Sequence, residues 1–120
     1  MTAAERMRET LRTDLKAAMR ERRQADVALI RTLIAAIDNA EAAPLPDGAK
    51  PADSASFASG AAEADRLVLD EADIAAILTA EAASRREAAA LIRQGGADNE
   101  AARLEREAGQ VLAYCGVPMP

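Results

Sequence analysis

The sequence VALIRTLIAAI, residues 27–37, decides the fold. Its large apolar side chains recur at spacings of three and four residues, which is the period of an α-helix. A helix that is apolar over so much of its circumference is expected to lie centrally among other helices. We therefore predict a helix from about Ala25 to Glu41. One stripe comprises Val27, Ile30, Ile34 and Ile37, and it is widened by Leu29, Leu33 and Ala36.

The same spacing predicts a helix before this one, over residues 3–22. Thr2 is suited to be its N-cap, with Glu5 as the capping-box partner three residues on. Residues 22–24 are where we expect the first helix to end, although nothing there forces a break. The predicted inward face carries Met7, Leu11, Leu15, Ala18 and Met19.

Two further helices are predicted near the C-terminus. The first covers residues 70–94: the Asp70 side chain can accept a hydrogen bond from the Asp73 N–H, and Gly95 and Gly96 end the helix. The second covers residues 98–114. Their predicted inward side chains are Ile74, Ile77, Leu78, Ala88, Leu91 and Ile92 on the first, and Ala101, Leu104, Ala108, Val111 and Leu112 on the second.

Residues 42–68 have a different composition. Three prolines and two glycines, interleaved with Ala, Ser and Asp, cannot sustain a helix. We predict a long loop, and favour an insertion, between two helical hairpins. The expected fold class is therefore all-α: residues 1–120 form a single four-helix, bundle-like domain of two hairpins joined by a Pro/Ala/Ser-rich loop.

The composition limits the chemistry that we expect. The chain has no histidine, one cysteine (Cys115) and a net charge of −5. Without histidine, the commonest general base and metal ligand is missing. We predict no catalytic residue, no metal site and no cofactor, and interpret Glu100, Glu105 and Glu107 as part of a solvated salt-bridge face. The lone cysteine, and the lack of a signal-like start or a long apolar run, favour a cytoplasmic protein with no membrane segment.

A cationic strip on the first predicted helix is the main candidate for binding. Arg8, Arg12, Lys16 and Arg20 recur every fourth residue, and Arg23 returns to the same side. Such a strip can follow a phosphate backbone. It is also typical of a solvated face whose side chains cover apolar surface, and the charge pattern alone favours that interpretation. The candidate RNA-binding residues are Arg12, Lys16, Arg20, Arg23 and, on the second helix, Arg31.

Several segments resemble one known family. DLKAAM at 14–19 and RTLIAAIDNAE at 31–41 are similar to the opening of the GatB/YqeY family, and LDEADI at 69–74 to the start of its third helix. Arg85-Arg86-Glu87, Gly96, Glu105, Glu107 and Tyr114 match it more loosely. Ala97 and Gly116 depart from the family's common Arg and Pro, and the family's C-terminal tail is expected to be absent because the sequence stops at Pro120.

The resemblance implies a role near tRNA. In that family, GatB is the tRNA-handling subunit of the glutamine-dependent aminoacyl-tRNA amidotransferase, a carbon–nitrogen ligase. The shared helical region approaches the tRNA and is not where ammonia is made or ATP is used. A non-catalytic accessory module that contacts tRNA, or a tRNA-bearing complex, is thus the leading hypothesis. The alternative is a protein–protein interaction module or self-assembling helical bundle without an RNA role, in which the acidic residues 70–120, net −4, meet a basic partner.

Overall fold

The computed structural model describes residues 1–42 and 67–116, and within these ranges it contains four helices and no strand. They are α1 (Ala3–Arg20), α2 (Gln24–Glu41), α5 (Glu71–Gln94) and α6 (Asp98–Tyr114). The predicted all-α class is confirmed, and the helix bounds agree within two residues. Most of the predicted loop at 42–68 lies outside the described residues.

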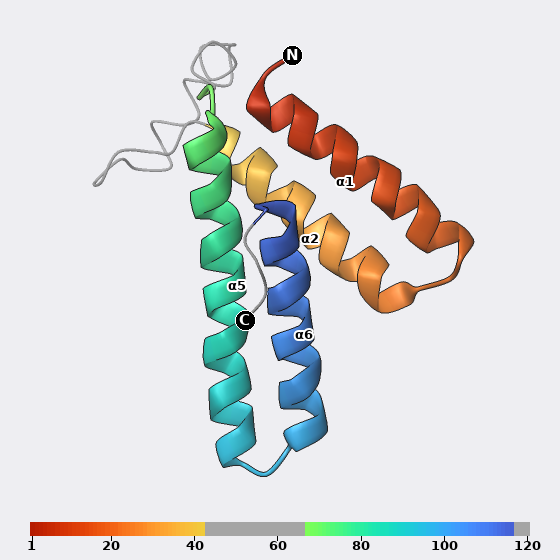
Figure 1. Cartoon of the computed structure of the whole chain (residues 1–120), viewed down its shortest axis with the longest axis vertical. Coiled ribbons are helices and arrows are strands. Elements are labelled where there is room, and N and C mark those ends of the chain that lie inside the picture. The colour runs from red at the N-terminus through yellow and green to blue at the C-terminus, as the bar shows by residue number, and fades with distance from the viewer. Residues whose placement is uncertain (43–66, 117–120) are drawn as a thin grey trace, which may run out of the picture.

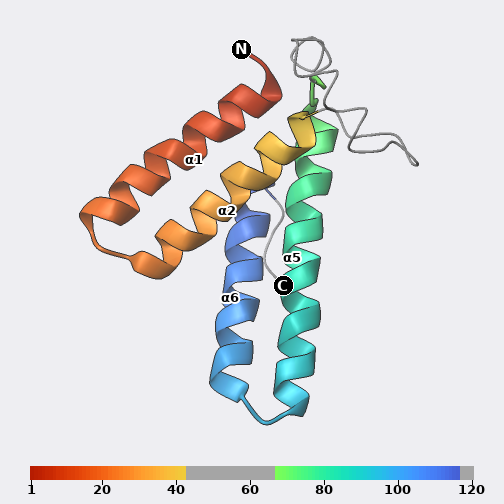
Figure 2. The ribbon, with the colours of Figure 1, turned by 180° about the vertical axis from the view of Figure 1, so that it is seen from behind.

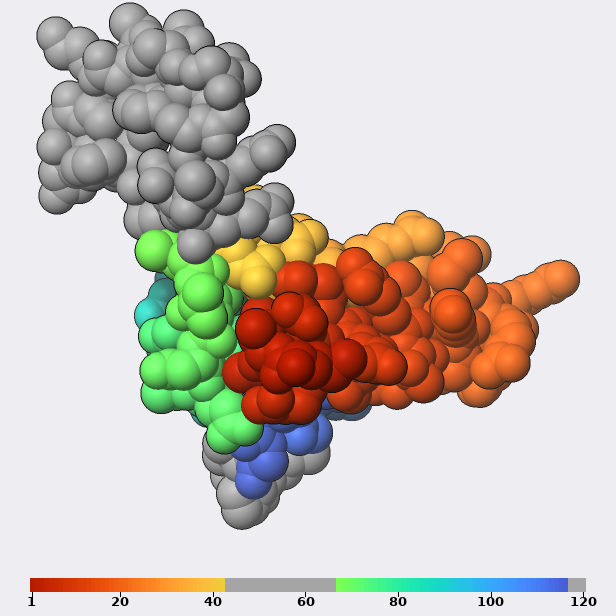
Figure 3. All heavy atoms as spheres, turned by 90° about the horizontal axis from the view of Figure 1, so that it is seen from above, coloured from red at the N-terminus to blue at the C-terminus, as the bar shows by residue number. Residues whose placement is uncertain are grey.

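The helices form two antiparallel hairpins that cross obliquely. In Figures 1 and 2, α1 and α2 run side by side, and α5 and α6 form a second, steeper pair. Figure 3 shows the start of α1 against the start of α5, while the turn between α1 and α2 points away from the second hairpin. An ion pair of 3.2 Å between Arg6 and Glu71 joins α1 to α5 at this contact. Each hairpin therefore has one end packed on its neighbour and one end projecting.

The hydrophobic core lies where the hairpins cross. Leu11 of α1, Leu33 and Ile37 of α2, Leu78 of α5 and Val111 of α6 are fully buried there. The remaining core is rich in alanine, which lets helices approach closely but buries little area per residue. The few large side chains therefore provide most of the apolar burial.

Two side chains that were predicted to face inward are exposed. Met19 is 52% exposed and Leu91 is 68% exposed. Both lie toward the projecting ends, where only the partner helix of the same hairpin covers them. On α5 the covered side is marked by buried Ala82 and Ala89, and Leu91 lies 200° further around the helix than Ala89. The helical spacing of the apolar residues was predicted correctly, but the buried face of each helix is narrower than predicted.

The helix ends follow the predicted capping chemistry at several points. The Thr2 hydroxyl accepts a hydrogen bond from the Glu5 N–H at 3.1 Å. Asp70 and Asp73 form a reciprocal capping box, with distances of 2.8 and 3.0 Å. Gly96 takes a φ of +89° after α5, a left-handed conformation that glycine adopts without steric cost. These local signals explain why the bounds could be predicted.

The end of α1 is set by a residue in an unfavourable conformation. Arg22 has a φ of +57°, in the left-handed region that non-glycine residues rarely occupy. The first helix therefore ends at Arg20 rather than at residue 22 as predicted. We expect Arg22→Gly to raise the free energy of unfolding by about 0.5–1 kcal/mol, because glycine removes the steric penalty. Urea denaturation would measure this, and a loss of stability would contradict the assigned turn geometry.

The backbone on either side of residues 43–66 is brought together. The Leu67 N–H donates a hydrogen bond of 2.9 Å to the carbonyl oxygen of Glu41, the last residue of α2. The chain thus leaves the first hairpin and enters the second at adjacent points. No helix in the described ranges is long and apolar enough to cross a bilayer.

Candidate functional site

The predicted RNA-binding residues are all exposed on the α1–α2 hairpin, and one of them, Arg23, forms ion pairs with neighbouring carboxylates. Arg12, Lys16, Arg20 and Arg31 are exposed and make no ion pair with another residue of 1–42 or 67–116. Arg12, Lys16 and Arg20 follow one flank of α1 with a rise of about 6 Å between neighbours. This spacing is suited to successive phosphates of a nucleic-acid strand.

Arg31 adds a cation from the neighbouring helix. The Arg8 guanidinium lies against Asp38 of α2, at 3.2 Å, which fixes the register of the antiparallel pair. Arg31 is seven residues, nearly two turns, before Asp38 and so lies on the same edge of α2. Lys16 is eight residues after Arg8 on α1, so it lies across from Arg31 on α2. The two helices therefore present their cations on a shared outer surface.

This surface faces away from the second hairpin. Asp14 of α1 contacts α6, because its carboxylate accepts a hydrogen bond of 2.6 Å from the Tyr114 hydroxyl. Lys16 is two residues further on and therefore points about 200° away around the helix. Residues 1–42 carry eight basic and seven acidic side chains, whereas residues 67–116 carry five and nine. The two hairpins thus differ in charge, and the cations gather on the first.

Arg23 differs from the other predicted residues because it forms ion pairs. Its guanidinium contacts the Glu21 carboxylate at 3.0 Å and forms a second ion pair with Asp26. The hydrogen bond with Asp26 is the main reason that the pKa of Arg23 is raised above its ordinary value. Two carboxylates already neutralise this charge, so Arg23 is poorly placed to attract a phosphate.

Arg8, which belongs to the same sequence strip, turns inward. Its side chain is 12% exposed and forms ion pairs with Asp38 and Glu41 on α2. Its Nε is buried and makes no hydrogen bond with the described residues, although it lies within ion-pair distance of Asp38. Arg8 therefore joins the two helices of the hairpin and is not part of the outer surface.

Sequence reasoning missed Arg22. A helix continued to residue 22 would have turned this side chain toward the core, but the helix ends at Arg20 and Arg22 is exposed in the turn. It makes no ion pair with another described residue. We define the cationic face by these exposed residues of the first hairpin: Arg12, Lys16, Arg20, Arg22 and Arg31.

The three glutamates of α6 form ion pairs, as predicted, but Glu107 is only 14% exposed, so the face is not fully solvated. Arg103 contacts Glu100 and Glu107 on its own helix, while Glu107 also lies 3.3 Å from Arg85 of α5. Arg85 in turn binds Glu81 at 3.0 Å, and Glu105 pairs with Arg93 across the hairpin. This network holds α5 and α6 together. Within the described ranges, no cluster of three or more His, Cys, Asp or Glu residues could hold a metal ion.

Tyr114 makes the main polar contact between α1 and α6. Partial burial, followed by the hydrogen bond to Asp14, raises the pKa of its hydroxyl above the ordinary value of 10. The folded state therefore keeps a proton that the unfolded chain releases above pH 10, so this contribution to stability is present at lower pH and is lost as the pH rises.

We expect Tyr114→Phe to remove this pH dependence. At pH 7 the variant should lose about 1 kcal/mol of stability, the typical value of such a hydrogen bond. Between pH 10 and 11 the wild type should lose up to about 1 kcal/mol relative to the variant, since solvent at this partly exposed side chain screens the effect. Chemical denaturation at several pH values measures both, and parallel pH profiles would contradict the prediction.

Comparison of the chain with models of protein families, with curated proteins and with solved structures found no match.

Proposed function

We propose that this chain is a non-catalytic accessory module that contacts RNA, with tRNA as the preferred form, through the cationic face. The observation that carries the proposal is that five exposed cations of one hairpin have no carboxylate partner among the described residues. The overall charge is −5, so broad attraction to polyanions is weak and binding depends on this local surface.

The preference for tRNA rests on the sequence resemblance to the GatB/YqeY family. The segments that carry it include residues 14–19 and 31–41, which also contain Lys16 and Arg31 of the cationic face. The role is positional: the module holds or orients an RNA for chemistry performed elsewhere, such as amide formation on a charged tRNA. We expect no carbon–nitrogen ligase activity from the chain by itself.

A salt titration tests the proposal. Labelled tRNA is titrated with the protein at 50 and 200 mM salt, and binding is followed by fluorescence anisotropy. Four phosphate contacts give a slope of about −3 in log affinity against log salt, which is a loss of about 60-fold over this range. Absence of binding at low salt, or an affinity that is independent of salt, would refute the RNA role.

Charge reversal on two surfaces locates the contact. The double variant Lys16→Glu/Arg31→Glu alters the cationic face, and Arg86→Glu/Arg106→Glu changes the net charge equally on exposed residues of the second hairpin. We expect the first to reduce the salt slope by about two, and the second to leave it nearly unchanged. Equal weakening by both variants would show that the cationic face is not the binding surface.

A protein–protein interface is the second candidate function. Exposed Leu91 on α5 and Met19 on α1 are large apolar side chains that a partner or a second copy could cover. Light scattering distinguishes the two functions. A tight oligomer in which α1 becomes protected from exchange would favour the interface, because the cationic face would then be covered.

A further inference from the structure

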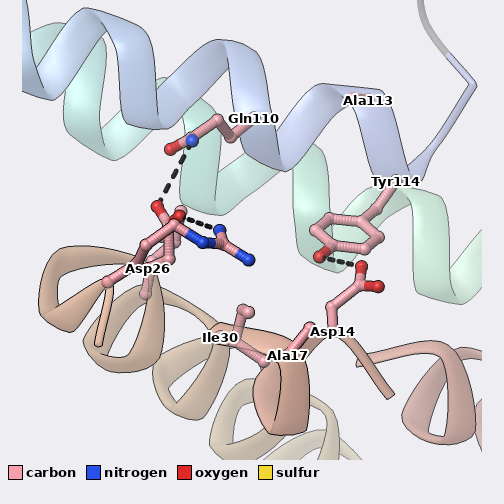
Figure 4. A pocket seen from close by; sticks show the side chains of 9 residues that line it. Asp14, Ala17, Asp26, Ile30, Gln110, Ala113 and Tyr114 are labelled. Carbon is pink, nitrogen blue, oxygen red and sulfur yellow. Dashed lines mark hydrogen bonds and ion pairs between the residues drawn. The ribbon is translucent and has the colours of Figure 1, made fainter. Parts of the chain in front are cut away.

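A cavity of about 370 Å³ lies between the α1–α2 hairpin and α6. Figure 4 shows it as a slot, with polar side chains at both ends and apolar side chains between them. One end is formed by Asp14 and Tyr114, and the floor by Ala17 and Ile30. The other end is formed by Asp26, its ion-pair partner Arg23 and Gln110.

The two ends differ in charge. At one end the Asp26 carboxylate is neutralised by its ion pair with Arg23, and it also accepts a hydrogen bond of 3.4 Å from the Gln110 amide. At the other end Asp14 accepts one hydrogen bond, from Tyr114 to its Oδ2, and has no cationic partner among the described residues. Among the carboxylates that line the cavity, Asp14 is therefore the one without an ion-pair partner in the described residues.

We propose that this cavity binds a small primary alkylammonium ion, with its charged end at Asp14 and its alkyl chain over Ala17 and Ile30. Asp14 Oδ1 is the oxygen that Tyr114 does not use, so it can accept a hydrogen bond from the ammonium group. The Tyr114 oxygen can accept another. An ion pair in a half-buried cavity is stronger than the same pair in water because the surrounding dielectric constant is lower.

The size of the cavity and its place in the fold suit such a ligand. Its volume falls at the lower end of the range for small-molecule sites, which limits the ligand to a short chain. The ligand would touch α1, α2 and α6 together, and so tie the two hairpins to each other. The site is independent of the proposed RNA contact, because the cationic face lies on the opposite flank of α1.

Titration with n-butylammonium chloride, at constant ionic strength, tests the proposal. We expect saturable shifts of backbone amide NMR signals around Ala17 and Tyr114 at millimolar concentrations, as for a ligand of about five heavy atoms. n-Butanol, which has a similar shape and no charge, should bind at least tenfold more weakly. A linear response without saturation, or equal affinity for the alcohol, would overturn the proposal.

Two variants separate the charge from the shape of the cavity. Asp14→Asn keeps an oxygen that can accept the Tyr114 hydrogen bond but removes the charge, and should weaken binding at least tenfold. Glu87→Gln removes the same charge from an exposed position on α5 and should leave the affinity unchanged. Ala17→Leu fills the cavity without changing any charge, and it should likewise weaken binding at least tenfold. Wild-type affinity in either cavity variant would show that the ion binds elsewhere.

Discussion

Leu33→Ala is expected to lower the free energy of unfolding by about 3 kcal/mol. Leu33 is fully buried on α2, where the two hairpins cross. Truncation removes apolar contacts and leaves a cavity, because the closely packed side chains around the site relax only in part. Since a domain of this size has a total stability of only about 5–15 kcal/mol, the loss is a substantial part of the whole.

Urea denaturation followed by circular dichroism measures this change. Thr32→Ala is the matched control, because it alters the neighbouring residue on the same helix and Thr32 is exposed. Its effect should stay within about 0.5 kcal/mol. If the two substitutions had similar effects, α2 would not be packed through its Leu33 face and the arrangement of the hairpins would be wrong.

Arg8→Met is the second substitution with a large expected effect, also about 3 kcal/mol. The Arg8 and Glu41 side chains are only 12% and 14% exposed, so removal of the cation leaves a nearly buried carboxylate without compensation. Asp38 is half-exposed and water can solvate it. The cost therefore comes mainly from Glu41.

A double substitution separates the charge from the packing. Adding Glu41→Gln to Arg8→Met removes the orphaned charge and should recover most of the lost stability. Arg12→Met, at an exposed position one turn away, should change stability by less than about 0.5 kcal/mol. If the double variant were no more stable than Arg8→Met, the lost aliphatic packing of Arg8 would be the cause rather than the charge.

The helices could be predicted because their determinants are local. The seam of Leu and Ile on residues 27–37, the side chains of Thr2 and Asp70 and the glycines after residue 94 act within one or two turns. The exposure of Met19 and Leu91 could not be predicted in the same way. It depends on the oblique crossing of the hairpins, which is set by contacts between residues far apart in the sequence.

The candidate site was predictable only in part, for a similar reason. Arg12, Lys16 and Arg20 share one flank through helical periodicity alone. The pair between Arg23 and Asp26 has a spacing of three residues, so its signal was present in the sequence. The inward turn of Arg8 depends on acids about 30 residues away, and the exposure of Arg22 on a left-handed turn that nothing in the sequence requires.

The hydrogen bond between Leu67 and Glu41 has a consequence for how this protein can vary. Because this bond holds Glu41 and Leu67 next to each other, a connection of another length can join them without changing the geometry of the two hairpins. Halving the number of residues in such a connection changes the free energy of closing it by only about 0.6 kcal/mol. Evolution or engineering can therefore shorten, extend or replace it, for example with an entire foreign domain, while the helices keep their relative placement.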